Sequence, residues 1–463
     1  MQQPEKCGDP SCTKTAAEVG LQKCGHCRAV AYSRKECQRE LGATHLQVVE
    51  ALQLQGFVPL PACACDVIEG YLEENEPVAL PGFTSHWSPA LSTPEGLLAS
   101  LGAETPVPVV QRQGTEAYGG GSVSLQPLGV FLSGGKDYLK DFHLPPALAS
   151  ASYCIPPALC DDALNPWLDN TEGGQSFRFL YAGFAGTRTP LHHDILLSHS
   201  WSCNTAGEKL WLLVSPGASE ALLYPRGRFQ ALAVESLLPA PVQRVLEDCG
   251  LLPPSPSSRA AAPHLPPALQ ERLLSRHPGC LRFHLQKAGE AVFVPSGWHH
   301  EVFNLGREGL TISINHNWIS VCSGPCLQGA YRFLAAELAE VRERLQDCKG
   351  DPEFDFLCER ALKTDAGLGL TELAQMLVKK VRDLRALLDR GEEGGAWGSA
   401  ARLAWVAPGV EHAAPASSRE RIAAGLENCA SVLRLLEVEG SAVAASGASC
   451  DGRPAKQNAV RKN

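Results

Sequence analysis

The chain has 463 residues, of which 44% are hydrophobic, enough for one large domain with smaller appendages. Its formal net charge of −9 argues against non-specific attraction to nucleic-acid phosphates, so we expect no direct nucleic-acid partner. No signal sequence and no bilayer-length apolar run is visible, which predicts a soluble intracellular protein without a membrane partner. We expect it in the cytoplasm, with the nucleus left open.

The first fifty residues have little apolar periodicity but are rich in cysteine. Four of the 18 cysteines lie close together at its start: Cys7, Cys12, Cys24 and Cys27. In a reducing compartment, cysteines are more often free thiols or metal ligands than disulfides. Because so small a segment has too little core to fold alone, we expect a metal to stabilise it.

From Gly56 onward the sequence changes to short apolar runs broken by proline and glycine, a pattern typical of strands and turns. Early examples are residues 77–82 and 105–110. The strongest strand signals lie between Ser176 and Trp318, at Phe177–Tyr181, Lys209–Val214, Ala291–Val294 and Leu310–Ile314. The sequence therefore predicts a β-rich core.

Two regions depart from this strand pattern. The proline-rich stretch Leu251–Pro267 cannot continue a ladder, so we predict a surface insertion there. After Cys326 apolar residues recur at helical spacing, and again over Leu370–Leu388. The predicted organisation is an N-terminal segment (1–50), a β domain (56–323, insertion about 251–267), a helical region (324–440) and a disordered tail (441–463).

His192 and Asp194 are separated by one residue, and on a strand two such side chains project from the same face. With a second histidine they would form the facial triad of non-haem Fe(II) oxygenases, which leaves coordination positions open. The spacing alone is weak evidence, since roughly 1.5 such pairs are expected by chance. A second pair occurs in His299-His300-Glu301, and a hydrogen-bonded strand histidine is the alternative for His192.

The context of the second histidine is more specific. Ala291-Val-Phe-Val-Pro-Ser-Gly-Trp-His-His300 is an apolar strand that enters a Pro-x-Gly-Trp turn, and a further strand ends at Trp318. With residues 138–144, 200–202 and 207–213, these motifs resemble the JmjC branch of the 2-oxoglutarate oxygenases, over roughly residues 56–345. Within that branch the chain is most similar to the lysyl hydroxylases of the eukaryotic translation termination factor.

The resemblance implies a mainly β fold with α-helices: a double-stranded β-helix (cupin or jelly-roll) JmjC core with flanking helices and a small zinc-finger-like segment. It implies that His192, Asp194 and His300 bind Fe(II), with His300 three residues after Gly297. Neighbouring strand residues point to opposite faces, so we expect His299 to face the outer side or a substrate-entry loop.

The same resemblance assigns the residues that bind 2-oxoglutarate. Lys209 stands where a lysine pairs with the distal carboxylate, and Thr189 where a threonine assists it. A carboxylate that enters an apolar barrel needs such a partner, although Lys209 could also be a solvated strand end. Ser202 replaces the family's usual asparagine, which leaves Asn204, Asn315 and Asn317 as further candidates or as strand-end caps.

The N-terminal cysteines resemble a MYND-type zinc finger with missing ligands. Ser33 and Val49 occupy ligand positions. Six ligands remain for weakly bound zinc: Cys7, Cys12 and Cys37 for one ion, and Cys24, Cys27 and His45 for the other. The segment is expected either to dock a peptide of a partner protein or only to pack on the main domain.

The function that the resemblance implies is Fe(II)- and 2-oxoglutarate-dependent hydroxylation of a protein, at a lysyl side chain of a translation termination factor, with release of succinate and CO2. One alternative is an N-methyl-lysine demethylase, because it uses the same metal ligands. Another is a non-catalytic protein-binding scaffold, against which the intact ligand set argues.

Overall fold

The computed structural model describes residues 22–23, 31–32, 35–65, 68–85, 87–110, 123–135, 137–219, 236–252, 265–306, 309–389 and 418–447. The predicted zinc ligands Cys7, Cys12, Cys24 and Cys27 lie outside these ranges, as do the side chain of Cys37 and residues 448–463 of the tail. No helix within the described ranges is both long and apolar enough to span a bilayer.

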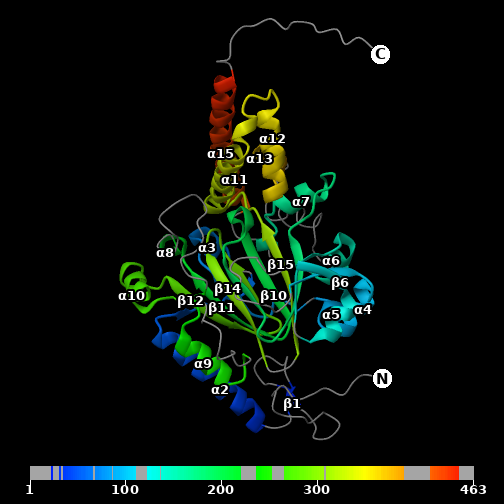
Figure 1. The fold of residues 1–463 in the computed structure, drawn as a ribbon, viewed down its shortest axis with the longest axis vertical. Helices are drawn as coiled ribbons and strands as arrows, with labels where there is room; N and C mark the ends of the chain where they lie inside the picture. The colour runs from blue at the N-terminus through cyan, green and yellow to red at the C-terminus, as the bar shows by residue number, and fades with distance from the viewer. Residues whose placement is uncertain are drawn as a thin grey trace, which may run out of the picture.

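Two facing β-sheets form the core (Figure 1). The larger has the order β4 (Val78–Leu80), β13 (Ala291–Val294), β10 (His199–Ala206), β15 (Leu310–Trp318), β8 (Arg178–Phe184), β7 (Tyr138–His143), β5 (Pro106–Val110) and β6 (Val123–Pro127). The smaller has the order β3 (Val58–Pro59), β12 (Leu281–Gln286), β11 (Glu208–Val214), β14 (His299–Leu305) and β9 (Arg188–His192). A separate pair joins β1 (Gln22–Lys23) and β2 (Ala31–Tyr32). Every strand pair but β3–β12 is antiparallel, as in a jelly roll.

The predicted β-rich core is confirmed, and all four of the strongest strand signals are strands. Apolar side chains from both sheets meet in the space between them, among them Trp211, Leu213, Val292 and Val294. Polar side chains share this space, because Leu213 is opposite His300 in the β11–β14 pairing. The inside of the barrel is therefore partly filled by apolar side chains and partly lined with hydrogen-bonding groups.

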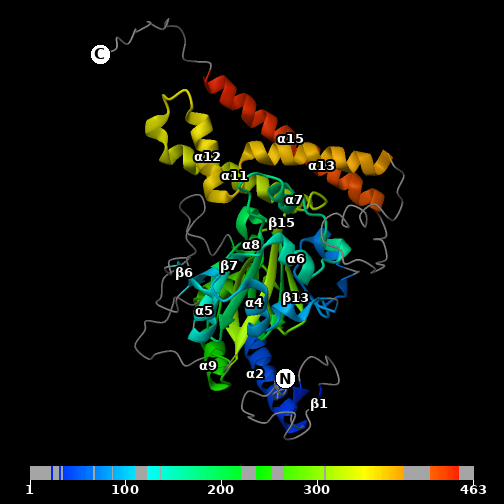
Figure 2. The same ribbon diagram turned by 90° about the vertical axis from the view of Figure 1, so that its right-hand side faces the viewer.

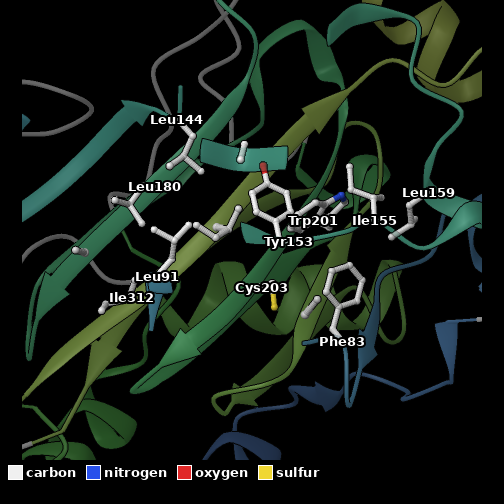
Figure 3. Packing of buried hydrophobic residues seen from close by; sticks show 14 of the residues in the cluster. Phe83, Leu91, Leu144, Tyr153, Ile155, Leu159, Leu180, Trp201, Cys203 and Ile312 are labelled. Atoms are coloured by element: carbon white, nitrogen blue, oxygen red, sulfur yellow. The ribbon is translucent and has the colours of Figure 1, made fainter. Parts of the chain in front are cut away.

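Helices cover the outer faces of the sheets. Short ones follow the first strands: α3 (Glu69–Glu74), η2 (Pro89–Leu91), α4 (Pro94–Leu101), α5 (Leu128–Gly134), α6 (Pro146–Ser152), η3 (Pro157–Leu159) and α7 (Leu164–Asp169). They bury the back of the larger sheet, where Figure 3 shows Phe83, Tyr153 and Trp201 packed together. The ring centroids of Phe83 and Trp201 are 5.2 Å apart.

The insertion between β11 and β12 is larger than predicted. It extends over residues 215–280 and contains α8 (Pro216–Ser219), α9 (Ala240–Asp248) and α10 (Pro267–Arg276). The sequence analysis identified only its proline-rich part, because the two amphipathic helices that flank this part lack prolines in their interiors. Val242 and Leu246 of α9 are fully buried against the smaller sheet, so these helices belong to the core.

Helix α2 (Lys35–Leu54) crosses residue 50, the predicted end of the N-terminal segment. Its residues Val48 and Leu52 are fully buried in the same cluster as α9. A cut at residue 50 would therefore remove part of the core, so the N-terminal segment and the β domain share this helix.

The C-terminal helices are α11 (Gly324–Arg344), η6 (Gln346–Cys348), α12 (Phe354–Ala366), α13 (Leu370–Asp389) and α15 (Ser418–Gly447). They gather beyond one end of the barrel, whereas α2 and α9 lie at the opposite end (Figures 1 and 2). The helix α15 continues past residue 440, where we predicted the disordered tail to begin.

Candidate metal centre and cosubstrate pocket

Three predicted ligands meet where β9 and β14 lie side by side. His192 ends β9 and pairs with His300 of β14, so both imidazoles project from the same face. One ligand atom each from His192, Asp194 and His300 lies within 4.8 Å of the others, close enough for one shared ion. One detail of the prediction is wrong: Asp194 is not on the strand but is the N-cap residue of the 3-10 helix η4 (Ile195–Leu197). Its backbone is still extended, so successive side chains continue to point to alternate sides as they do along the strand.

Hydrogen bonds orient the three ligands. His192 Nδ1 lies 2.7 Å from the carbonyl oxygen of Pro190, and His300 Nδ1 lies 3.4 Å from that of Trp298. Ser200 Oγ donates to Asp194 Oδ2 at 2.6 Å. Burial lowers the pKa of both histidines, so the neutral imidazole prevails. If each Nδ1–H donates to its carbonyl, each Nε2 lone pair is available for a metal.

His299 lies on the outer face of β14, opposite to that of His300, as expected, but it is buried there and does not line an entry loop. Only 7% of its surface is exposed, and its ring centroid lies 5.1 Å from that of His193. His193 in turn lies against Phe333 of α11. Since β14 is covered by the C-terminal helices here, even its outward-facing histidine is enclosed, and burial lowers the pKa of His299 to about 3.

Glu301 forms a buried cluster on the opposite face of β14 from His300. Its carboxylate accepts hydrogen bonds from Arg188 Nη1 at 2.7 Å, Ser236 Oγ at 2.9 Å and the Leu237 amide at 2.8 Å. The alternative pair His299-x-Glu301 therefore does not form a metal site. Arg188 belongs to β9, so this ion pair joins the two strands that carry the metal histidines.

We expect Glu301→Ala to lower the free energy of unfolding by about 3–5 kcal/mol, because Arg188 and two further donors lose a buried partner. Urea unfolding of the full chain measures this effect. Glu343→Ala, at an exposed position of α11, is the matched control and should change stability by about 0.5 kcal/mol or less. An equal effect of both substitutions would show that the Glu301 cluster does not hold the strands together.

Lys209 is buried inside the barrel without a carboxylate partner. Only 2% of it is exposed, and its Nζ donates to Ser313 Oγ of β15 at 2.6 Å. Within the described parts of the chain no carboxylate lies within ion-pair distance of it, and burial lowers its pKa to about 7. Because a buried ammonium without a counter-charge is costly, this position fits an anionic ligand.

A tyrosine that the sequence analysis did not assign lies in the same pocket. The hydroxyl of Tyr138, on β7, lies 3.3 Å from Thr189 Oγ1 on β9. Asn304 is opposite Lys209 in the β11–β14 pairing, and its amide donates to Thr187 Oγ1 at 2.8 Å. The motif at residues 138–144 had marked the region, but only the strand pairing shows that Tyr138 reaches the pocket.

The other candidate residues differ in their hydrogen-bond partners. Ser202 is opposite Asn315 in the β10–β15 pairing, and its Oγ donates to Asn315 Oδ1 at 2.9 Å on the inner face. Asn204 Nδ2 instead donates to the Gly207 carbonyl at 3.0 Å, and Asn317 Nδ2 to Ser198 Oγ at 3.3 Å. In the same ladder Asn204 is opposite Ser313, the partner of Lys209, and Asn317 is opposite Ser200, so all four candidates lie on the inner face.

Comparison with known proteins agrees with this geometry. Residues 140–324 match the family model of the cupin-like domain. The two-sheet core has the fold of a cupin-like domain. Similar proteins include the 2-oxoglutarate and iron-dependent oxygenase JMJD4 of Homo sapiens, 35% identical over 255 residues (55% of this chain, 52% of that protein). The JMJD4 of Danio rerio is 32% identical over 289 residues (59% and 60%).

The arginine-specific demethylase JMJ20 of Arabidopsis thaliana is also similar, with 29% identity over 255 residues (51% of this chain, 46% of that protein). The chain spans about half the length of the curated relatives it matches. The similar proteins thus include both 2-oxoglutarate and iron-dependent oxygenases and an arginine-specific demethylase.

The predicted zinc site has one described ligand, His45 on α2. Its Nε2 lies 3.1 Å from Glu208 Oε2 at the start of β11, so this nitrogen contacts the cupin-like domain. The side chains of the other five predicted ligands lie outside the described residues. Zinc binding by the N-terminal segment stays a prediction.

Proposed function

We propose that this protein is an Fe(II)- and 2-oxoglutarate-dependent protein hydroxylase. The observation that carries the proposal is that one barrel contains both the three-ligand site and the buried Lys209, which has no carboxylate partner among the described residues. Two histidines and a carboxylate form the donor set of non-haem Fe(II) oxygenases. The names of the JMJD4 relatives support iron and 2-oxoglutarate as the cofactor and the cosubstrate.

In this proposal each residue has a defined task. His192, Asp194 and His300 hold Fe(II) by one face, while Lys209 and the hydroxyls of Thr189 and Tyr138 hold the distal carboxylate of 2-oxoglutarate. When bound, iron and 2-oxoglutarate would supply, with dioxygen, an oxidant for an unreactive C–H bond; one oxygen atom ends in succinate and the other in the product, and CO2 is released. The apolar side chains beside His300, among them Trp211 and Leu213, exclude water, and the protein contributes mainly by positioning the target bond.

The narrower proposal is that the target is a lysyl side chain of a translation termination factor, which rests on the sequence resemblance. Its test incubates the full chain with Fe(II), ascorbate, 2-oxoglutarate and lysine-containing peptides of that factor. We expect one peptide to gain the mass of one oxygen atom without formaldehyde. If the wild-type protein consumes 2-oxoglutarate but modifies none of the peptides, this substrate is wrong.

The similarity to an arginine-specific demethylase supports a second candidate function. Hydroxylation of an N-methyl group yields an unstable product that releases formaldehyde, whereas a hydroxyl group on carbon persists. The same assay with N-methylated peptides therefore separates the two functions. Formaldehyde release in equal amount to succinate would favour the demethylase.

We expect the affinity for 2-oxoglutarate to fall as the pH rises above 7. The carboxylate pairs with the ammonium form of Lys209, whose pKa in the free protein is lowered to about 7 by burial. At higher pH binding must first protonate the lysine, so the apparent Kd should increase about tenfold from pH 8 to pH 9. Calorimetric titration with 2-oxoglutarate, with Mn(II) in place of iron, measures the apparent Kd at each pH.

The matched control for this pH dependence is Lys209→Arg, because arginine stays charged throughout this range. Its affinity should change little between the same two pH values. A pH dependence that is identical in both proteins would assign the titration to another group.

A further inference from the structure

The inner face of the larger sheet continues beyond the barrel. Tyr138 of β7 is opposite Val110 of β5, and Val110 is opposite Val123 of β6. Directly opposed residues of antiparallel strands share a face, so these side chains lie on the face from which Tyr138 contacts Thr189. The cosubstrate pocket and the outer strands β5 and β6 therefore share one continuous surface.

This outer surface is apolar and exposed. It consists of six side chains, which we name the β5–β6 face: Pro106, Pro108, Val110, Val123, Leu125 and Pro127. Val123 and Leu125 are 62% and 72% exposed, whereas Val107 and Val109 on the reverse face are fully buried with α4 and α5. Within the described parts of the chain no strand pairs with the outer edge of β6, which lies at the sheet margin in Figure 1.

Exposed apolar residues on an unprotected edge strand are a liability that proteins usually avoid. When they are kept, they mark a surface that binds a partner, and an extended peptide can pair with the free edge. The β5–β6 face therefore fits a polypeptide better than a small molecule.

A charged pair lies between the β5–β6 face and the metal site. Asp141 follows Lys140 at an irregularity of β7 and has a left-handed backbone, with φ of 59°. Its Oδ1 accepts a hydrogen bond from Tyr181 at 2.5 Å, and its Oδ2 lies 3.6 Å from Lys140 Nζ. The Asp141 side chain is still 53% exposed. A non-glycine residue in this conformation costs about 1–3 kcal/mol and is commonly kept where function requires it.

The position of this pair relative to the ligands follows from its neighbours. The ring of Tyr181 lies 6.1 Å from that of Tyr138, so the hydroxyl that holds Asp141 borders the pocket. Tyr138 itself contacts Thr189 Oγ1 in the pocket. Through the Tyr181 hydroxyl, Asp141 thus presents an exposed carboxylate beside the tyrosines that border the pocket.

We propose that the β5–β6 face, with Asp141 at its inner end, docks an extended segment of the polypeptide substrate. Apolar side chains of the segment cover Val123 and Leu125, and the basic side chain of the target residue pairs with Asp141. The contact of 3.6 Å with Lys140 is long, so an incoming ammonium group can replace it. This inference rests on the proposed function and adds the surface and the charge that select the substrate.

The test compares two variants of the full chain with two matched controls. Leu125→Glu places a charge on the β5–β6 face. Its control is Leu54→Glu, which introduces the same charge at a leucine on α2 that is 84% exposed. Asp141→Asn removes the carboxylate but tolerates the left-handed backbone. Its control is Asp383→Asn on α13, since Asp383 is also 53% exposed and paired with a lysine.

We expect Leu125→Glu and Asp141→Asn each to raise the KM for a lysine-containing termination-factor peptide about tenfold, with unchanged thermal unfolding midpoints. The controls should leave KM unchanged. A competing peptide with norleucine at the target position should bind wild type and Asp141→Asn equally, because it lacks the ammonium group.

Three results would overturn the inference. KM values equal to those of the controls would show that the substrate docks elsewhere. A loss of norleucine-peptide affinity in Asp141→Asn would show that Asp141 does not act through charge. If the wild-type protein oxidises 2-oxoglutarate but hydroxylates none of the lysine peptides, the proposed lysyl substrate is wrong, and this inference fails with it.

Discussion

Replacing His300 with alanine should abolish iron binding and turnover, whereas replacing His299 should leave iron binding intact and at least part of the turnover. His300 shares a site with His192 and Asp194, and loss of one of three protein ligands leaves too few to hold the ion. His299 points to the other face and packs against His193. Metal content and succinate formation, measured on both purified variants, test this prediction.

Both histidines are buried, so the metal content of the variants is compared only where each variant is folded. The thermal unfolding midpoint of each variant shows this. His192→Ala serves as a second ligand variant and should behave as His300→Ala does. Iron retained by His300→Ala but lost by His299→Ala would shift the register of β14 by one residue.

Lys209→Ala should weaken 2-oxoglutarate binding about 100-fold, since truncating one partner of a buried charge pair costs about 2–5 kcal/mol. Iron affinity should not change, because the lysine is not part of the ligand set. Calorimetric titration of the Mn(II)-loaded protein with 2-oxoglutarate measures the effect.

The ligand-free protein offers an independent check on the same residue. A buried ammonium without a counter-charge costs stability, so Lys209→Ala should not lower the free energy of unfolding. Unchanged 2-oxoglutarate affinity would instead mean that another basic residue binds the distal carboxylate.

The sequence was sufficient for the parts of the site that are local along the chain. The apolar run before the Pro-x-Gly-Trp turn predicted β13, and the resemblance carried by this turn implied His300 as a ligand. His192 and Asp194, one residue apart, do lie in one site, even though Asp194 lies past the strand. Each of these features depends on a few consecutive residues, whose backbone conformation local preferences already restrict.

The rest of the site depends on which strands become neighbours. Tyr138 reaches Thr189 and Lys209 reaches Ser313 only because strands distant in the sequence face each other. The Glu301 cluster likewise needs Ser236 from the insertion. No periodicity in a single sequence encodes these pairings, so a buried serine or tyrosine could not be told from an ordinary strand residue.

The central claim, an iron centre that uses 2-oxoglutarate and dioxygen, is tested most directly with dioxygen labelled with oxygen-18. The full chain is incubated with Fe(II), 2-oxoglutarate and the termination-factor peptides, and the masses of succinate and peptide are measured. We predict one heavy oxygen atom in succinate and one in the hydroxylated peptide. Succinate without label, or equal label incorporation by wild type and His300→Ala, would contradict the assignment.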